Sequence, residues 1–315
     1  TLENTRQMFC YYFGTLPPAE VNAHIMIDIL TSGFRPHPAV HALATNRRGT
    51  YENRERAHLH NPRDIQPQRP MHASIRKYTY MTEHYVMGCV QHQDPYPESC
   101  PGKWYAHHEQ HQWDLSFAGH TRARLFSHHP GLDRVEHGYW TGDMRCGCGR
   151  FLQQRAALVA LYCIPEDQPY RFIHAYAPRD VFDEYHQDEH WIFVRKGDAF
   201  AGLQLCNGHN AAPEGEFKDC EIRSPGAVNA VVCEAGSSDE YPSFEAFKAA
   251  ISGNPVRFDI ESRSVTYRSA RYGALFLDPQ RRQLNGRDID LDYKRFDCPF
   301  LQSEWGSGIV EVKSG

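Results

Sequence analysis

The stretch 256-VRFDIESRSVTYRS-269 decides the fold, because it holds both halves of a β-hairpin and the turn between them. Residues 256–260 and 264–269 alternate apolar with polar or charged side chains, as a strand with one buried face does. Residues 261–263 are polar and form a link short enough for a tight turn. The pattern therefore predicts two antiparallel strands that meet at residues 261–263.

Segments of the same kind follow one another from about residue 71 onward. They are rich in Val, Ile, Tyr, Phe and Thr, and Gly, Pro, Asn or Asp separates them. They cover residues 77–91, 111–119, 122–131, 155–165, 170–178, 190–205, 226–236, 256–269 and 273–291, the last with a turn at 278–281. The exception is 243-SFEAFKAAIS-252, where an N-cap Ser243 and the apolar stripe Phe244, Phe247 and Ile251 predict a helix. Many strands without alternating helices predict a mainly β protein with a large antiparallel β-sandwich.

The N-terminal part has helical periodicity instead. In 16-LPPAEVNAHIMIDILTSGF-34 two prolines open the pattern, Val21, Ile25 and Ile29 lie on one helical face, and Gly33 stands just past its end. Residues 46–70 are polar, contain proline and predict a connector. The expected organisation is thus a short α-helical segment and linker over residues 1–70 and an antiparallel β-sandwich over residues 71–315.

The charge and hydropathy of the chain exclude some classes of binding partner. The chain has 315 residues and a formal net charge of -5, with no block of basic residues. Nucleic acid is therefore not expected as a partner, because phosphate binding needs a clustered basic face, whereas a local Arg/His pocket can still hold an acidic sugar. No apolar run approaches the ~18 residues of a membrane span, so no membrane span is expected. The opening TLENTRQMFC shows no signal peptide, and the compartment, cytoplasmic or periplasmic, stays open.

The ten cysteines show no repeated spacing. Several lie inside apolar strand patterns, where a thiol acts as a small hydrophobe. We expect them to be mostly reduced and buried.

The strand 111-HQWDLSF-117 carries an unusual apolar face. His111, Trp113, Leu115 and Phe117 share that face by alternation. An imidazole there suggests that the face lines a cleft, with Trp113 as the wall of the cleft and a contact for substrate. His129 lies on the next predicted strand, so a hairpin brings it within reach of His111. Two imidazoles with a further carboxylate or amide suit Zn²⁺ or another divalent metal, and two structural histidines are the alternative.

The order of these segments resembles the C-terminal β-sandwich of the heparinase II/III-like polysaccharide lyases, over roughly residues 71–315. That family carries a strand motif H-x-H-x-D-x-L-S-F, which His111, Leu115, Ser116 and Phe117 match. Where the family has an acidic metal ligand, this chain has His129. The resemblance implies cleavage of a uronic-acid-containing polysaccharide by β-elimination. It also implies an α/α toroid before the sandwich. Residues 1–45 can hold only the end of such a toroid. A separate N-terminal helical fragment or subunit is therefore an expected partner.

The chain departs from the family at three positions, of which His129 in place of the acidic ligand is one. Glu109 stands where the family has the first histidine, and residues 154–157 read QRAA where the family has a later His-Asn pair. The missing toroid favours an alternative from another class, a non-catalytic glycan-binding or assembly sandwich that pairs with a helical catalytic domain.

Three further groups are candidates for the chemistry. His174 and Tyr176 share a strand face and, with His111, are candidate catalytic residues for proton transfer, with an aromatic ladder as the alternative. The Gly-rich stretch 139-YWTGDMRCGCGRF-151 offers Trp140 to stack on a sugar and Arg145 and Arg150 to clamp a carboxylate, with a plain turn as the alternative. The acidic pairs at 183–184 and 188–189 allow a glycoside hydrolase as a third function, although a solvated loop explains them better.

Overall fold

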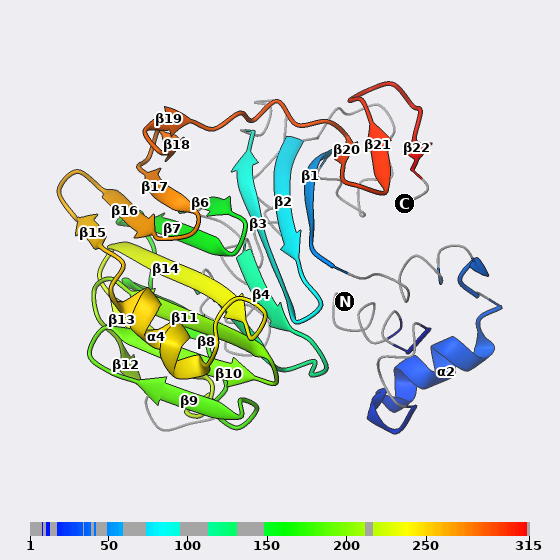
Figure 1. Ribbon diagram of the computed structural model, residues 1–315, viewed down its shortest axis with the longest axis horizontal. Coiled ribbons are helices and arrows are strands. Elements are labelled where there is room, and N and C mark those ends of the chain that lie inside the picture. The colour runs from blue at the N-terminus through cyan, green and yellow to red at the C-terminus, as the bar shows by residue number, and fades with distance from the viewer. Residues whose placement is uncertain are drawn as a thin grey trace. The chain divides into compact units, whose positions relative to one another are not determined.

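The mainly β architecture is confirmed in a computed structural model, which describes residues 8, 11–12, 18–33, 35–38, 41, 49–58, 74–94, 113–130, 148–211 and 217–313. The chain divides into two compact units, Thr1–Gly49 and Thr50–Gly315. Figure 1 shows the second unit as packed antiparallel sheets.

The first unit contains the predicted helix. A 3-10 turn, η1 (Pro18–Glu20), leads into α2 (Ala23–Thr31). Val21, Ile25 and Ile29 are its buried residues, as the helical stripe predicts.

The large sheet of the second unit has eleven strands, and every neighbouring pair of strands is antiparallel. In spatial order they are β12 (Asn210–Ala211), β13 (Glu221–Pro225), β8 (Phe172–Tyr176), β5 (Arg124–His128), β4 (Trp113–Phe117), β3 (Tyr85–Gln93), β2 (Ser74–Met81), β1 (Tyr51–His58), β20 (Phe296–Asp297), β21 (Leu301–Ser303) and β22 (Glu311–Val312). Strand β1 lies within the stretch expected to be a connector, so the boundary between the units differs from the expected one. Its sequence, YENRERAH, has no apolar alternation, and its side chains are held by polar contacts such as the Glu55–Lys77 ion pair of 3.0 Å.

Two smaller sheets complete the second unit. One has the order β6 (Gly149–Gln154), β7 (Ala157–Cys163), β14 (Val228–Ser237), β11 (Ala199–Leu205), β10 (Trp191–Lys196) and β9 (Glu184–Gln187). The other has the order β15 (Val256–Asp259), β16 (Ser264–Ser269), β17 (Gly273–Leu277), β18 (Arg282–Leu284) and β19 (Arg287–Asp288). The hairpins predicted at 256–269 and 273–291 are β15–β16 and β17–β18.

The predicted helix at 243–252 is α4 (Phe244–Ser252). Ser243 caps it by accepting a hydrogen bond from the amide of Ala246. Its apolar stripe packs on β10 and β11, where Phe247 lies 6.3 Å from Phe193 and 5.7 Å from Phe200, ring to ring. A Cβ at Gly202 of β11 would lie 2.8 Å from the ring of Phe193, so only glycine fits between helix and sheet.

The core lies between the large sheet and the six-stranded sheet. In the large sheet alternate residues such as Met87, Leu115 and Leu125 are fully buried, while β7 and β14 are buried at almost every position. Polar bonds also cross the gap: the Gln91 amide nitrogen donates to the Gln153 carbonyl at 3.2 Å. These two layers form the sandwich.

A buried carboxylate joins the two smaller sheets. Glu234 of β14 is completely buried and accepts hydrogen bonds from Tyr267 (2.5 Å) and Ser269 (3.2 Å) of β16. Burial raises the pKa of Glu234 to about 7, although both hydrogen bonds oppose the rise. The carboxyl group therefore titrates near neutral pH.

Candidate functional site

A row of buried polar side chains crosses three neighbouring strands, β13, β8 and β5. Glu221 lies 3.0 Å from Nδ1 of His174, and Nε2 of His174 lies 2.9 Å from Nδ1 of His128. The exposed fractions are 2% for Glu221, 0% for His174 and 3% for His128. Arg223 holds both oxygens of Glu221, at 3.0 and 3.2 Å. We call Glu221, His174 and His128 the histidine row.

The row determines which imidazole nitrogens carry protons. A carboxylate held by the fork of Arg223 is ionised and accepts hydrogen bonds, so His174 donates its Nδ1–H to Glu221. Burial, helped by Arg223 and His129, lowers the pKa of His174 although Glu221 opposes it, so the ring is neutral and its Nε2 is an acceptor. His128 must then donate its Nδ1–H to His174. In the neutral form of His128 the lone pair is then on Nε2, an atom that is itself buried.

Aromatic rings and arginines lie beside the row. Phe126 is stacked between His128 (centroids 5.7 Å apart) and Tyr176 (5.0 Å). Burial raises the pKa of Tyr176 in spite of a hydrogen bond from Arg122, which also pairs with Asp180 at 3.0 Å. Tyr176 is therefore a protonated phenol at neutral pH.

The row and these rings lie on one face of the large sheet. Their strand neighbours Leu125, Ile173 and Ala175 are buried in the core on the other face. His174 and Tyr176 thus share one face of β8, as predicted. That face is turned away from the core.

The position of Trp113 shows that its prediction as the wall of a cleft is wrong. It is completely buried in the core, and its indole N–H donates to the hydroxyl of Ser127 at 2.9 Å. Ser127 in turn contacts the hydroxyl of Tyr162 in the six-stranded sheet at 3.0 Å. Trp113 packs between the layers and cannot be the wall of a cleft or stack on a sugar.

The two expected metal ligands have different outcomes. His111 lies outside the described residues. His129 is completely buried and donates its Nε2–H to the backbone carbonyl of Tyr170 at 2.8 Å. Within the described ranges, no converging group of three or more His, Cys, Asp or Glu side chains includes His128 or His129. The expected zinc site on His111 and His129 thus stays a prediction.

Of the expected sugar-binding loop, Trp140 and Arg145 also lie outside the described residues. Arg150 is on β6, opposite Leu161 of β7, and is partly buried. The structure thus places Arg150 in the six-stranded sheet and the histidine row in the large one.

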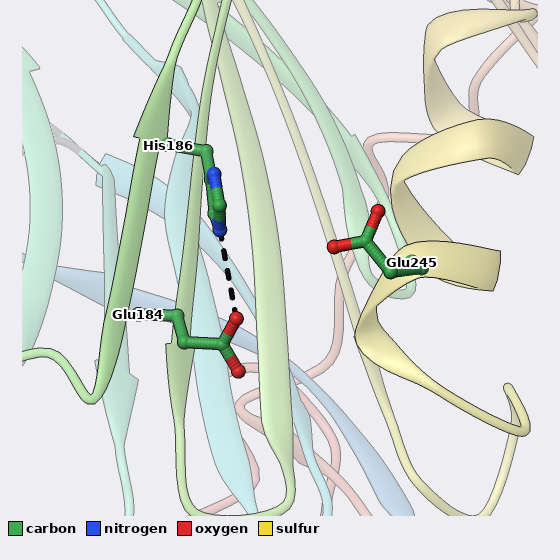
Figure 2. Close-up of side chains that lie close together, drawn as sticks. All are labelled: Glu184, His186 and Glu245. Atoms are coloured by element: carbon green, nitrogen blue, oxygen red, sulfur yellow. Dashed lines mark ion pairs between the residues drawn. The ribbon is translucent and has the colours of Figure 1, made fainter.

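One group within the described ranges has the composition of a metal site. Figure 2 shows Glu184 and His186 together on β9, with Glu245 of α4 pointing toward them. One ligand atom of each lies within 4.8 Å of the others. However, Glu184 is held by Arg195 at 2.6 Å and Glu245 by Lys248 at 2.7 Å. The carboxylates already have cationic partners, so a metal would have to displace them.

The acidic pairs considered for a glycoside hydrolase have structural roles in the described loop. The Gly197 amide and Lys196 lower the pKa of Asp183. Asp188 accepts hydrogen bonds from the amides of His190 and Trp191 and so closes a turn. The expected solvated loop is wrong for residues 184–187, which form strand β9, whereas Asp188 lies in the turn that follows.

Sequence reasoning missed His128 and Glu221. The signal that was present is the pair of adjacent histidines at 128–129, which point to opposite faces of a strand, so that one of them had to face away from the core. Glu221 gave no signal, because its partner is 47 residues away in sequence.

Comparison with protein-family models, curated proteins and solved structures found no match. Among the described residues, neither α-helix is long and apolar enough to cross a lipid bilayer.

Proposed function

We propose that the chain is a polysaccharide lyase, or the β-sandwich portion of one, that cleaves a uronic-acid-containing polysaccharide by β-elimination. The observation that supports it is the histidine row, which directs a lone pair to Nε2 of His128. A carboxylate that orients one imidazole through its N–H is the usual way to set a histidine for proton transfer. The resemblance to the heparinase II/III-like lyases supplies the substrate class.

The reaction needs three functions. Nε2 of His128 is buried, so the scheme requires that substrate binding exposes this atom. His128 then accepts the proton from C5 of the uronate, and the electron pair of that C–H bond becomes the C4–C5 double bond. The C4–O bond breaks, and Tyr176, a protonated phenol, gives its proton to the leaving oxygen. Arg122, which is exposed beside Tyr176, pairs with the substrate carboxylate and makes the C5 proton more acidic.

In this scheme His174 is a positioning residue. It is completely buried and acts only through His128, whose tautomer it sets. The scheme differs from the sequence-based one, in which His111, His174 and Tyr176 act directly. His111 stays a candidate for a metal ligand or second base.

The test is product formation on a panel of uronate polymers, followed by the ultraviolet absorbance of the unsaturated product. We expect product with the wild type, loss of about a hundredfold or more with His128→Ala, and no change with the exposed control His190→Ala. Tyr176→Phe should reduce the rate while the fold is kept, as circular dichroism would show. Absence of product on every polymer would refute the proposal, as would a His128→Ala variant as active as His190→Ala.

A further inference from the structure

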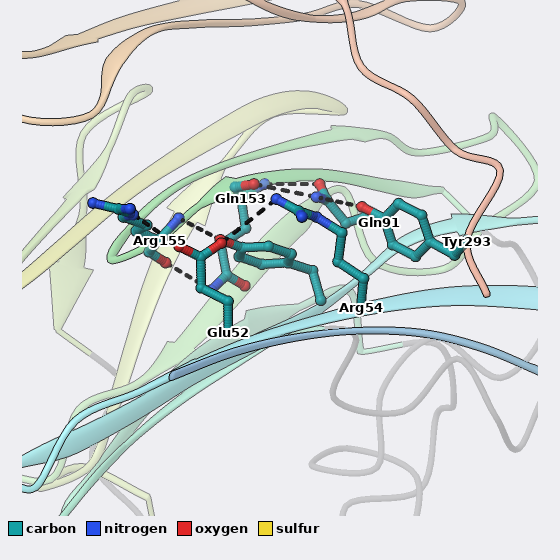
Figure 3. A network of polar contacts seen from close by, with 7 residues as sticks. Glu52, Arg54, Gln91, Gln153, Arg155 and Tyr293 are labelled. Carbon is teal, nitrogen blue, oxygen red and sulfur yellow. Dashed lines mark hydrogen bonds and ion pairs between the residues drawn. The ribbon is translucent and has the colours of Figure 1, made fainter. Parts of the chain in front are cut away.

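A cleft lies beside β1, β2 and β3 of the large sheet, away from the strands of the histidine row. It has a volume of about 490 Å³, which is in the range of small-molecule sites. Its walls are β1, β2 and β3 of the large sheet, the end of β6, and the segment that runs from β18 to β20. Figure 3 shows the side chains of its floor and of the wall beside it.

The floor of the cleft consists of buried polar side chains. Tyr78, Gln91, Gln153 and Tyr293 are 1%, 3%, 1% and 6% exposed. The amide nitrogen of the Gln91 side chain donates to the Tyr293 hydroxyl at 3.2 Å, and its oxygen accepts from the backbone amide of Gln153 at 2.9 Å. These bonds join β3, β6 and the C-terminal segment, so the floor is formed before any ligand arrives.

The Gln153 side chain has one orientation only. Its nitrogen donates to the backbone carbonyls of Met87 (3.0 Å) and Arg155 (2.8 Å), and a flipped amide would place oxygen against both. Its Oε1 is therefore fixed as an acceptor, and it is buried without a hydrogen-bond partner among the described residues. An unsatisfied buried acceptor is costly and marks a place for a donor such as a hydroxyl group or water.

Tyr78 is also fixed by residues beside the cleft, Glu52 and Arg155, which do not line it themselves. Tyr78 donates to Glu52 at 2.7 Å, and Arg155 holds the other oxygen of Glu52 at 2.8 Å. Arg54 lies over the Tyr78 ring, 5.4 Å from its centroid. Burial and the Glu52 carboxylate both raise the pKa of Tyr78, so its hydroxyl stays protonated. The two tyrosines of the floor are thus held in fixed positions, largely buried, among fixed donors and acceptors.

The charges that line the cleft select among ligands. Four carboxylates line it, Asp288, Asp290, Asp292 and Asp297, against three cations, Arg54, Arg287 and Lys294. This excess of acceptors, together with Gln153 Oε1, favours a ligand rich in hydroxyl or amine donors and disfavours one that carries a carboxylate.

We propose that this cleft binds a neutral or amino sugar. Aromatic rings beside planar amide, guanidinium and carboxylate groups suit a polyhydroxylated ring of that size. The cleft uses the core-facing side of the large sheet, where Tyr78 lies, and the histidine row uses the opposite side. Sugar binding here does not depend on lyase chemistry, and it would equally serve a non-catalytic glycan-binding module.

The experiment is calorimetric titration of the whole chain with glucose, galactose, glucosamine, N-acetylglucosamine and glucuronate. We expect at least one neutral or amino sugar to bind, and to bind more tightly than glucuronate. Gln153→Leu, which removes the fixed acceptor, should weaken binding by about five- to tenfold. No binding by any of these sugars, or tighter binding of glucuronate, would overturn the proposal.

A matched pair of arginine variants completes the design. Arg287→Ala removes an exposed arginine from the rim and should weaken binding severalfold, whereas Arg257→Ala removes an equally exposed arginine from β15, outside the cleft, and should leave binding unchanged. Equal affinities for the two variants would count against the cleft as the binding site. If Gln153→Leu does not fold, this pair decides by itself. All the readouts are binding constants, so they are separate from any test of lyase activity.

Discussion

Replacing Glu234 with glutamine should stabilise the protein at alkaline pH and not at acid pH. The folded pKa of Glu234 is about 7 against a normal value of 4.5. The folded state therefore binds this proton more tightly than the unfolded state. The stability associated with this group is complete below about pH 4.5 and is lost as the pH rises to about 7.

The size of the effect follows from the same two values. The rise of the pKa from 4.5 to about 7 corresponds to about 3 kcal/mol lost at about pH 8. Glutamine avoids this cost but keeps only one of the two acceptors used by Tyr267 and Ser269, which offsets about 1 kcal/mol. We expect Glu234→Gln to be about 2 kcal/mol more stable than the wild type at about pH 8, and within about 0.5 kcal/mol of it at about pH 5.

Urea denaturation at the two pH values measures this difference. The control is Glu261→Gln, the same chemical change at an exposed residue of the β15–β16 turn, which should have no effect at either pH. A Glu234→Gln variant that is equally stable relative to the wild type at both pH values would refute the assignment of a neutral-range pKa to this group.

Three further predictions concern the core and the histidine row. Trp113→Ala should lower the free energy of unfolding by about 3–5 kcal/mol in urea titration, because the indole is completely buried; a loss below about 1 kcal/mol would argue for an exposed ring. Gly202→Ala should cost about 1–3 kcal/mol by the same assay, since the new methyl group meets the Phe193 ring, and a neutral effect would mean that this ring can move aside. Burial lowers the pKa of His174, so stability should be lost as the pH falls below about 6.5. His174→Gln should make the melting temperature depend less on pH in this range. An unchanged pH dependence would mean that other groups cause the loss.

Local patterns were sufficient for the hairpins and for α4. The β15–β16 and β17–β18 pairs join neighbouring segments, and the alternation and turn residues that specify them lie within a few residues of one another. Strand β1 was missed for the opposite reason. Its residues are charged on both faces, and it forms a strand because β2 and β20 pair with it, which no local signal reports.

The sequence predicted the types of residue in the site, histidine and tyrosine, better than it predicted which individual residues form it. The apolar face that holds Trp113 was identified, but an indole whose N–H finds a partner on the next strand can be core as well as cleft wall. The histidine row depends on the register that places His128 opposite His174 and His174 opposite Arg223. Such a register between distant segments is set by tertiary packing and cannot be derived from the spacing of residues along the chain.

The pairing of β1 with β20 has a consequence for how the protein is made. β1 is among the first segments of the second unit to be synthesised, yet Arg54 pairs with Asp297, and the Arg56 amide donates to the Lys294 carbonyl at 2.7 Å. The edge of β1 that pairs with β20 therefore stays unpaired until the residues up to β20 have been synthesised. During that time it is an open template for other extended chains, and its alternating charges protect it from such pairing. The same delay means that the cleft lined by β1 to β3 and by residues 284–297 cannot form until residues 284–297 have been synthesised.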